Sequence, residues 1–209
     1  MNGDVVDPPA MARIREALAS FPLRDRVLVE LLAGSGLRRV EVCALNVEDA
    51  HLGADPHVKA TRRKKRRPGE PEKVRIPARV ADLLRVYLGL RKTGPLIESR
   101  QHAKEGKPTR LSGRQVLRIV EAVGEAIGLR LHPHGFRHYH GTAYQDVRKD
   151  PMATMRRLGH EDVRTTGKYM DGWGRQDRQA VEAVDALPSD PGLPSRSDAN
   201  QRGVPRRQT

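Results

Sequence analysis

The chain has 209 residues, enough for one large domain or for one domain with small appendages. Lysine and arginine number 39 against 26 acidic residues, and the resulting net charge of +13 favours a polyanionic partner, above all nucleic acid. The single cysteine, Cys43, excludes an internal disulfide framework and a cysteine-based zinc site, and no uncharged apolar run approaches the ~20 residues of a membrane span.

Helical periodicity dominates the first 50 residues of the chain. After Pro8 and Pro9, "AMARIREALASF" predicts a helix, and "LRDRVLVELLAGSG" predicts a second one that Gly34 and Gly36 are suited to end. The stretch "RRVEVCALNVEDA" predicts another short helix and the chain that leaves it. The residues before these helices include acidic side chains and no apolar core of a secretory signal, so we expect a cytoplasmic protein without a membrane span.

One stretch changes from helical to β-like periodicity. The short runs "HVKAT" and "KVRIP" flank the basic segment "RRKKRRPGEPE", so residues 57–77 predict a small hairpin with a long basic loop. No other stretch has a convincing strand pattern. The expected fold class is therefore mainly α with a small antiparallel β-sheet (α+β).

Helical patterns return after Pro77. The stretches "ARVADLLRVYLGLRK" and "LSGRQVLRIVEAVGEAIGL" are strongly amphipathic, the second with Ser112 as its N-cap, and a polar loop over 98–110 separates them. Shorter helices are predicted over 134–147, 151–158, 162–170 and 175–187. The proline, serine and glycine content that follows predicts a disordered basic tail. The expected organisation is a short extension over 1–9, one main domain over 10–187 and the tail over 188–209.

Five polar residues stand out by their type and order. His134 and Arg137 lie three apart, hence on one face of a predicted helix. Arg38 follows a glycine-bearing helix end, His160 follows a glycine, and Tyr169 lies in the polar stretch "TTGKYM". Two guanidinium groups can each bind a phosphodiester with paired hydrogen bonds and stabilise the charge that develops at phosphorus. A tyrosine hydroxyl, with an ordinary pKa of about 10, needs such a cationic cluster to act as a nucleophile.

This set resembles the tyrosine recombinases, the phage-integrase-type site-specific recombinases. Their hallmark is an arginine in a G-L-R box, then H-x-x-R, then G-H, then a nucleophilic tyrosine, and the five residues follow that order. Twenty-three residues separate Arg137 from His160 and nine separate His160 from Tyr169, spacings similar to those of the family. Glu41, three residues after Arg38, matches the R-x-x-E continuation. The resemblance extends from about residue 10 to about residue 187.

The resemblance implies the catalytic-domain fold of these enzymes and a DNA recombination or integration activity. Tyr169 would attack a DNA phosphate and form a covalent 3′-phosphotyrosine intermediate, within a site formed by Arg38, His134, Arg137 and His160. Because that linkage keeps the bond energy, resealing needs no ATP, metal or other cofactor. The expected partner is double-stranded DNA, bound by a homo-tetramer on two DNA sites.

The resemblance also implies a general acid, which in the family is a lysine of the β-hairpin loop, commonly in a G-K-G context that this chain lacks. Counting from the "HVKAT" strand places Arg63 or Lys64 at this position. We favour Lys64, with Lys65 second, because an arginine does not release its proton at working pH. The other charges of the loop are expected to contact the DNA backbone without sequence choice.

Several other interpretations remain open. Family members usually carry a helical core-binding domain before the catalytic domain, and we expect none in this sequence, so the alternative function is a truncated or non-catalytic DNA-binding protein that keeps the fold. Charge alone would fit an RNA-binding protein. The histidines of "LHPHGFRHYHG" invite a metal interpretation, but no nearby cysteine or H-E-x-x-H spacing completes a site, and we expect none. Segment 175–187 would either dock on a neighbouring protomer or pack on its own core.

Overall fold

The N-terminal helices form where apolar residues recur at helical spacing. The computed structural model describes residues 4–61, 70–99 and 109–159, all within one compact unit, Met1–Met170. Helix α1 (Pro8–Leu18) begins at Asp7, whose side chain accepts a hydrogen bond from the Ala10 N–H at 2.8 Å, and proline in its first turn suits a helix start. Its predicted apolar face is buried, so the first predicted helix is confirmed.

Helix α2 (Leu23–Ser35) lies at the centre of the core and packs against both α4 (Ala78–Leu88) and α6 (Pro133–Arg148). Its sequence has apolar residues on more than one face, and most of the helix is buried: Val27, Leu28, Val29, Leu31 and Leu32 are all 0% exposed. Gly36 ends α2 in the left-handed conformation with φ +64°. A Cβ at this position would lie only 2.5 Å from the His140 ring, so glycine is required both by backbone angle and by space.

The predicted hairpin is confirmed, as part of a three-stranded antiparallel sheet. Strand β2 (His57–Ala60) pairs with β3 (Glu72–Arg75), so that His57 lies opposite Arg75 and Ala60 opposite Glu72. The third strand, β1 (Ala50–His51), follows a 3₁₀ turn (Val47–Asp49) and pairs with the outer side of β2. Two residues are too few to show a period of two, so the sequence pattern missed β1.

The polar loop expected over 98–110 is partly wrong. A second antiparallel pair, β4 (Glu98–Ser99) with β5 (Thr109–Arg110), occupies its two ends. These strands also have two residues each, too short for a readable pattern. The pairing brings Arg110 to the carbonyls of Cys43 and Leu45, which it binds at 2.8 Å each.

The remaining described elements are helical, as predicted. They are α3 (Arg39–Ala44), α4, α5 (Gly113–Glu125), α6 and α7 (Pro151–Leu158). Ser112 caps α5 in a reciprocal capping box with Gln115, which confirms the predicted start of that helix. The helices predicted over 162–170 and 175–187 and the tail over 188–209 lie outside the described residues.

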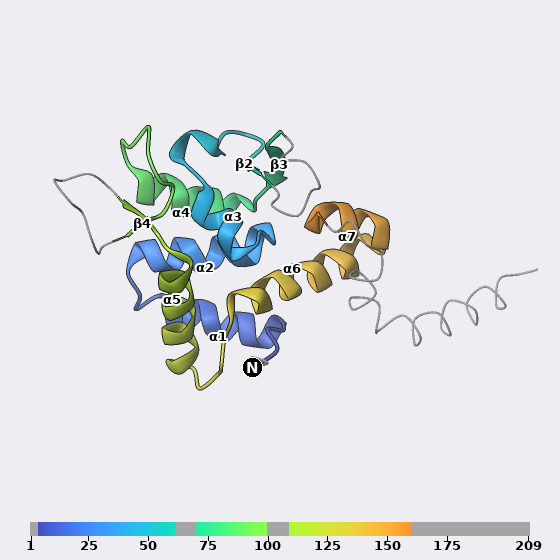
Figure 1. The fold of residues 1–209 in the computed structure, drawn as a ribbon. Helices are drawn as coiled ribbons and strands as arrows, with labels where there is room; N and C mark the ends of the chain where they lie inside the picture. Colours follow the sequence, from blue (N-terminus) through green and yellow to red (C-terminus); the bar gives the residue numbers. More distant parts are fainter. Residues whose placement is uncertain (1–3, 62–69, 100–108, 160–209) are drawn as a thin grey trace, which may run out of the picture. The chain divides into compact units, whose positions relative to one another are not determined.

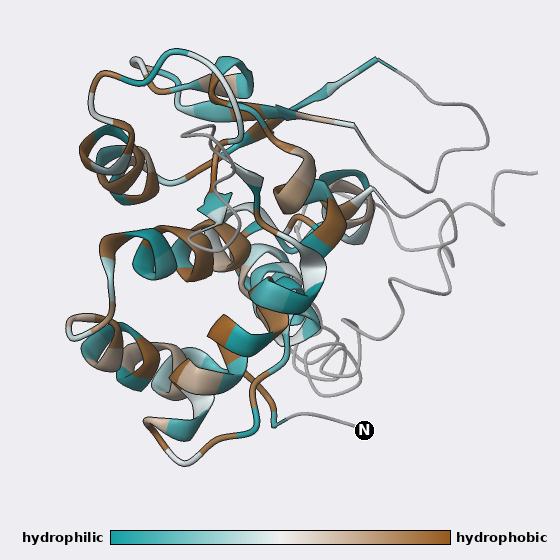
Figure 2. Ribbon diagram, turned by 60° about the vertical axis from the view of Figure 1, so that its left-hand side comes forward, coloured by the Kyte–Doolittle hydropathy of each residue, from teal (hydrophilic) through white to brown (hydrophobic). Residues whose placement is uncertain are grey.

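The fold is mainly helical with small antiparallel sheets, which confirms the predicted fold class (Figure 1). Figure 2 shows apolar stripes alternating with polar ones around the helices, the pattern from which the sequence predicts them. In the described ranges, no helix is both long and apolar enough to cross a membrane.

Candidate active site

Arg38 leaves the core at the turn between α2 and α3. The turn is fixed by Gly36 and by the fully buried Leu37, so the chain emerges with Arg38 as the residue before α3. Glu41, one turn further along and 2% exposed, accepts from the Arg38 backbone N–H at 2.8 Å and from its Nη1 at 3.0 Å. A buried carboxylate needs such partners. Glu41 therefore holds the Arg38 backbone and guanidinium together in one orientation.

Arg137 comes from α6 and is only 1% exposed. Its two Nη groups donate to the Gly36 and Leu158 carbonyls, each at 2.5 Å. These carbonyls belong to the C-terminal ends of α2 and α7, where backbone acceptors lack helical partners and the helix dipoles are negative. A permanent cation at this point joins the two helix ends and is stabilised by both of them.

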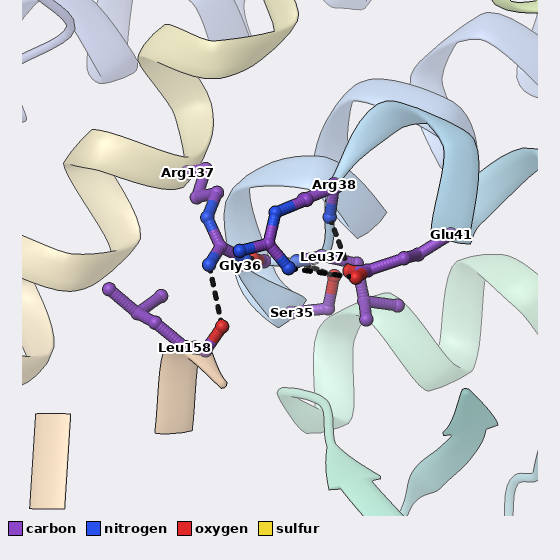
Figure 3. A network of polar contacts seen from close by, with 7 residues as sticks. All are labelled: Ser35, Gly36, Leu37, Arg38, Glu41, Arg137 and Leu158. Atoms are coloured by element: carbon purple, nitrogen blue, oxygen red, sulfur yellow. Dashed lines mark hydrogen bonds and ion pairs between the residues drawn. The ribbon is translucent and has the colours of Figure 1, made fainter. Parts of the chain in front are cut away.

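Figure 3 shows the Arg38 and Arg137 side chains extending toward each other, one from the start of α3 and the other from α6. The two residues are about a hundred positions apart in the chain, and the α2–α6 packing brings them together. The predicted pair of guanidinium groups therefore exists as one cluster.

His134 lies in the first turn of α6, one helical turn before Arg137. The pKa of His134 is lowered, first by partial withdrawal of its ring from solvent and then by the positive charges of Arg137, nearby histidines and Arg38. Because His134 and Arg137 lie one turn apart on α6, they share one face of that helix. Its imidazole stays neutral at neutral pH, so it can accept a proton or donate one hydrogen bond.

The other predicted catalytic residues, Lys64, His160 and Tyr169, lie outside the described residues, as do Arg63 and Lys65. The described strands β2 and β3 end on either side of 62–69, and the described chain stops one residue before His160. The structure brings together Arg38, His134 and Arg137 and does not describe the other three positions.

The histidines considered as metal ligands have separate structural contacts. His132 caps α6 by accepting from the His134 N–H at 3.2 Å, and His140 contacts the Ala33 carbonyl at 3.0 Å. Across the described ranges, no group of three or more histidine, cysteine, aspartate or glutamate side chains is placed to hold a metal ion.

Sequence reasoning missed the pairing of His140 with Arg157 of α7, whose Nε donates to His140 Nε2 at 3.0 Å. Position 140 lies three residues after Arg137, so helical spacing already places it near that face. Its partner is on another helix, and no local pattern identifies a contact of that kind.

Comparison with known proteins identifies consistent relatives. The phage integrase family matches residues 5–172. Tyrosine recombinase XerA of Pyrococcus furiosus is 29% identical over 178 residues, which cover 84% of this chain and 59% of the relative. XerA of Thermococcus kodakarensis is 32% identical over a match that covers 78% of this chain and 57% of the relative. Tyrosine recombinase XerC of Neisseria gonorrhoeae is 33% identical, with 70% of this chain and 47% of the relative covered. The chain thus spans roughly half the length of these curated relatives.

Solved structures with the same fold include the XerA recombinase, with a TM-score of 0.69 and 23% identity over 85% of this chain and 62% of that one. A lambda integrase dimer bound to a COC′ core site gives a TM-score of 0.61 and 20% identity, with 82% of this chain and 49% of that one covered. At these identities the likeness concerns the fold.

Proposed function

The chain belongs to the phage integrase family, and from this premise we propose that it is a tyrosine site-specific recombinase that cuts and rejoins DNA strands. Tyr169 attacks a phosphodiester, a covalent 3′-phosphotyrosine forms, and the deoxyribose 5′-oxygen leaves with a proton. The relatives carry the name tyrosine recombinase, and several structural neighbours are complexes with DNA, which supports this reaction and its substrate class.

The observation that carries the proposal is the convergence of Arg38 and Arg137 beside His134. In the described residues, only Nη1 of Arg38 has a side-chain partner, so Nε and Nη2 face no competing protein group. Such a planar donor pair fits two oxygens of one phosphate. Arg137 adds a fixed positive charge beside it. The attraction of both guanidinium groups to the phosphate grows as the phosphorus becomes five-coordinate and its oxygens gain negative charge.

The reaction needs one group that accepts the phenolic proton and another that protonates the leaving oxygen. His134 has a lowered pKa and is neutral at working pH, so it can accept the phenolic proton or support its transfer. Lys64, between β2 and β3 in the sequence, is proposed to protonate the leaving oxygen, with Lys65 as the second candidate. His160 is proposed to donate to the phosphate from the chain that follows α7.

We also propose that double-stranded DNA is bound by four protomers on two sites. The net charge of +13 supports a DNA partner, and the structural neighbours include a lambda integrase dimer bound to a core site and a XerH recombinase bound to its difH substrate. Covalent chemistry in a cationic site requires neither a metal ion nor ATP, so the reaction is expected to run in the presence of chelator.

A nicked suicide duplex carrying the target site tests the proposal. The chain should form a covalent protein–DNA adduct in EDTA, and Tyr169→Phe should abolish the adduct while leaving DNA affinity unchanged. Tight DNA binding without an adduct would instead identify a non-catalytic DNA-binding protein with the recombinase fold. An adduct that persists in Tyr169→Phe would reject Tyr169 as the nucleophile.

A further inference from the structure

A second concentration of positive charge lies outside the Arg38–Arg137 cluster. A cavity of about 530 Å³ is lined by residues of β3, the C-terminal half of α6 and α7. Five cationic side chains line it, two from the strand and three from the helices: Lys73, Arg75, Arg148, Arg156 and Arg157. Its described lining includes no carboxylate. We refer to it below as the basic cavity.

The charges of the basic cavity are only partly neutralised. Asp55, an exposed residue beside the strand, pairs with both Lys73 and Arg75, the latter at 3.0 Å, so one carboxylate serves two cations. Arg148 and Arg156 are exposed, and within the described residues no ion pair engages either of them. A cation in the last turn of a helix is favoured by the helix dipole. That effect does not explain the strand cations on the facing wall.

One wall of the basic cavity is rigid. Arg157 donates through Nε to His140 Nε2 at 3.0 Å and through Nη2 to the Arg75 carbonyl at 2.6 Å. Arginine can only donate, so His140 Nε2 must accept, and the ring proton lies on Nδ1, which donates to the Ala33 carbonyl at 3.0 Å. The imidazole is thus neutral and in one tautomer. The chain of bonds fixes α7 against α2 and β3 and keeps the Arg157 charge at the cavity.

We propose that the basic cavity binds a phosphate group other than the one held by Arg38 and Arg137. Several guanidinium groups around one opening suit phosphate, because each offers paired donors and a permanent charge. On the basis of the function proposed above, the ligand is a backbone phosphate of the same DNA duplex. His140, which lines the basic cavity, follows Arg137 by three residues, about 4.5 Å along α6, so one helix carries both the Arg38–Arg137 cluster and a wall of the cavity.

The site would also lie beside two elements that lead to proposed catalytic residues. Strand β3 follows Lys64 in the sequence, and Leu158, next to Arg157, supplies the carbonyl that holds Arg137. A phosphate bound between β3 and α7 would therefore fix the duplex against both elements that lead to the proposed general acid and to His160.

The main test compares two double variants of the full chain. Arg148→Gln with Arg156→Gln removes two exposed cations of the basic cavity. Arg114→Gln with Arg118→Gln removes two exposed cations of α5, for which the described residues likewise show no ion pair, and serves as the matched control. Binding to a non-specific 30-base-pair duplex is measured by fluorescence anisotropy over a range of salt concentrations. Loss of one phosphate contact should weaken binding about fivefold to tenfold and lower the slope of log K against log salt by about one, with little change in the control.

Two further variants are expected to keep the salt slope or to tighten binding. Arg148→Lys with Arg156→Lys keeps both charges and should keep the wild-type slope. Asp55→Asn releases Lys73 and Arg75 from their shared carboxylate and should tighten binding about twofold to fivefold, in the range of one weak surface ion pair. Equal weakening by the cavity and control double variants, or weaker binding by Asp55→Asn, would overturn the proposal.

The source of the phosphate is tested separately with inorganic pyrophosphate, titrated by calorimetry in the absence of DNA. One outcome would keep the phosphate site and reject the duplex as its ligand. In that outcome pyrophosphate binds the wild type but not the cavity variant, while both proteins bind the duplex with equal affinity. The covalent assay is independent of both measurements. If the suicide duplex gives no adduct while the cavity variant still changes the salt slope, the recombinase proposal fails and the phosphate site stands.

Discussion

The helices α6 and α7 carry two groups of cations that are held in different ways. Arg137 is 1% exposed, and backbone carbonyls at two helix ends fix its guanidinium. Arg148 and Arg156 lie on the same two helices but are exposed, without a carboxylate partner in the described structure. One group is preorganised before any ligand arrives, and the other can follow the position of its ligand.

This difference corresponds to two tasks that a phosphate-handling protein must perform. A charge that stabilises a transition state is effective only if it needs no rearrangement at the moment of reaction, which favours burial and fixed hydrogen bonds. A charge that holds a DNA backbone gains from mobility, because the contact is sequence-independent and its strength comes largely from counterion release. The two groups should therefore respond differently to substitution.

The largest effect is expected from Arg137→Ala, which leaves the Gly36 and Leu158 carbonyls buried without their charged donor. Hydrogen bonds to charged groups contribute about 1.5–3 kcal/mol each, so the free energy of unfolding should fall by about 3–5 kcal/mol. Urea denaturation of the wild type and of Arg137→Ala measures this loss in the free energy of unfolding. Arg148→Ala, on the same helix but exposed, should change the free energy of unfolding by less than about 0.5 kcal/mol. Similar losses in both variants would contradict the distinction between the two groups.

Gly36→Ala should affect both groups at once. Its carbonyl binds Arg137, while its Cα lies against His140, which positions Arg157 in the wall of the basic cavity. An alanine would meet the His140 ring at 2.5 Å and would need a positive φ, which together should destabilise the fold by about 2–3 kcal/mol. Denaturation measures the loss, and Gly53→Ala is the control, because a Cβ there meets nothing within 4 Å. Comparable losses at the two glycines would show that the two groups do not share this junction.

The difference between these two groups also marks how far the sequence was informative. Arg38, His134 and Arg137 are predicted from the short motifs that carry the family resemblance, and the long helices from their 3.6-residue period, because both signals are local. The burial of Glu41 and the contact of His140 with Arg157 depend on packing between α2, α6 and α7, which no local period encodes. Strands β1, β4 and β5 were missed for a different reason, since two residues cannot display an alternation.

A smaller effect is expected from Glu41→Gln, which tests how far Arg38 depends on its buried partner. An amide keeps one acceptor but turns its NH₂ group toward a donor of Arg38, so one of the two hydrogen bonds is lost. The expected cost is about 1–2 kcal/mol in the free energy of unfolding, with a fall of about tenfold to a hundredfold in the rate of adduct formation through loss of Arg38 orientation. Glu48→Gln, an exposed carboxylate of the following turn, is the control. An unchanged rate in Glu41→Gln would show that Arg38 is oriented by other contacts.

The smallest effect concerns the titration of His134, which reports the electrostatic reach of each group of cations. Its pKa is lowered by partial desolvation and by neighbouring positive charges, of which Arg137 is the largest and Arg38 a smaller one. Since a positive neighbour disfavours the imidazolium, Arg38→Gln should raise the pKa of His134, and Arg148→Gln should leave it unchanged. Because the folded pKa lies below that of the unfolded chain, the folded state binds fewer protons, and stability should be lost as pH falls below about 6.5.

An NMR titration of the histidine ring protons, with the His134 signals assigned by comparison with His134→Gln, measures these pKa values directly. His51 is the internal control, since its pKa is also lowered but by desolvation and by groups of the sheet, His57 first and then Lys59. The pKa of His51 should be the same in the wild type, in Arg38→Gln and in Arg148→Gln. A shift of His134 in Arg148→Gln as large as that in Arg38→Gln would mean that the two groups of cations act as one electrostatic site, and the contrast between fixed and adaptable charges would lose its basis.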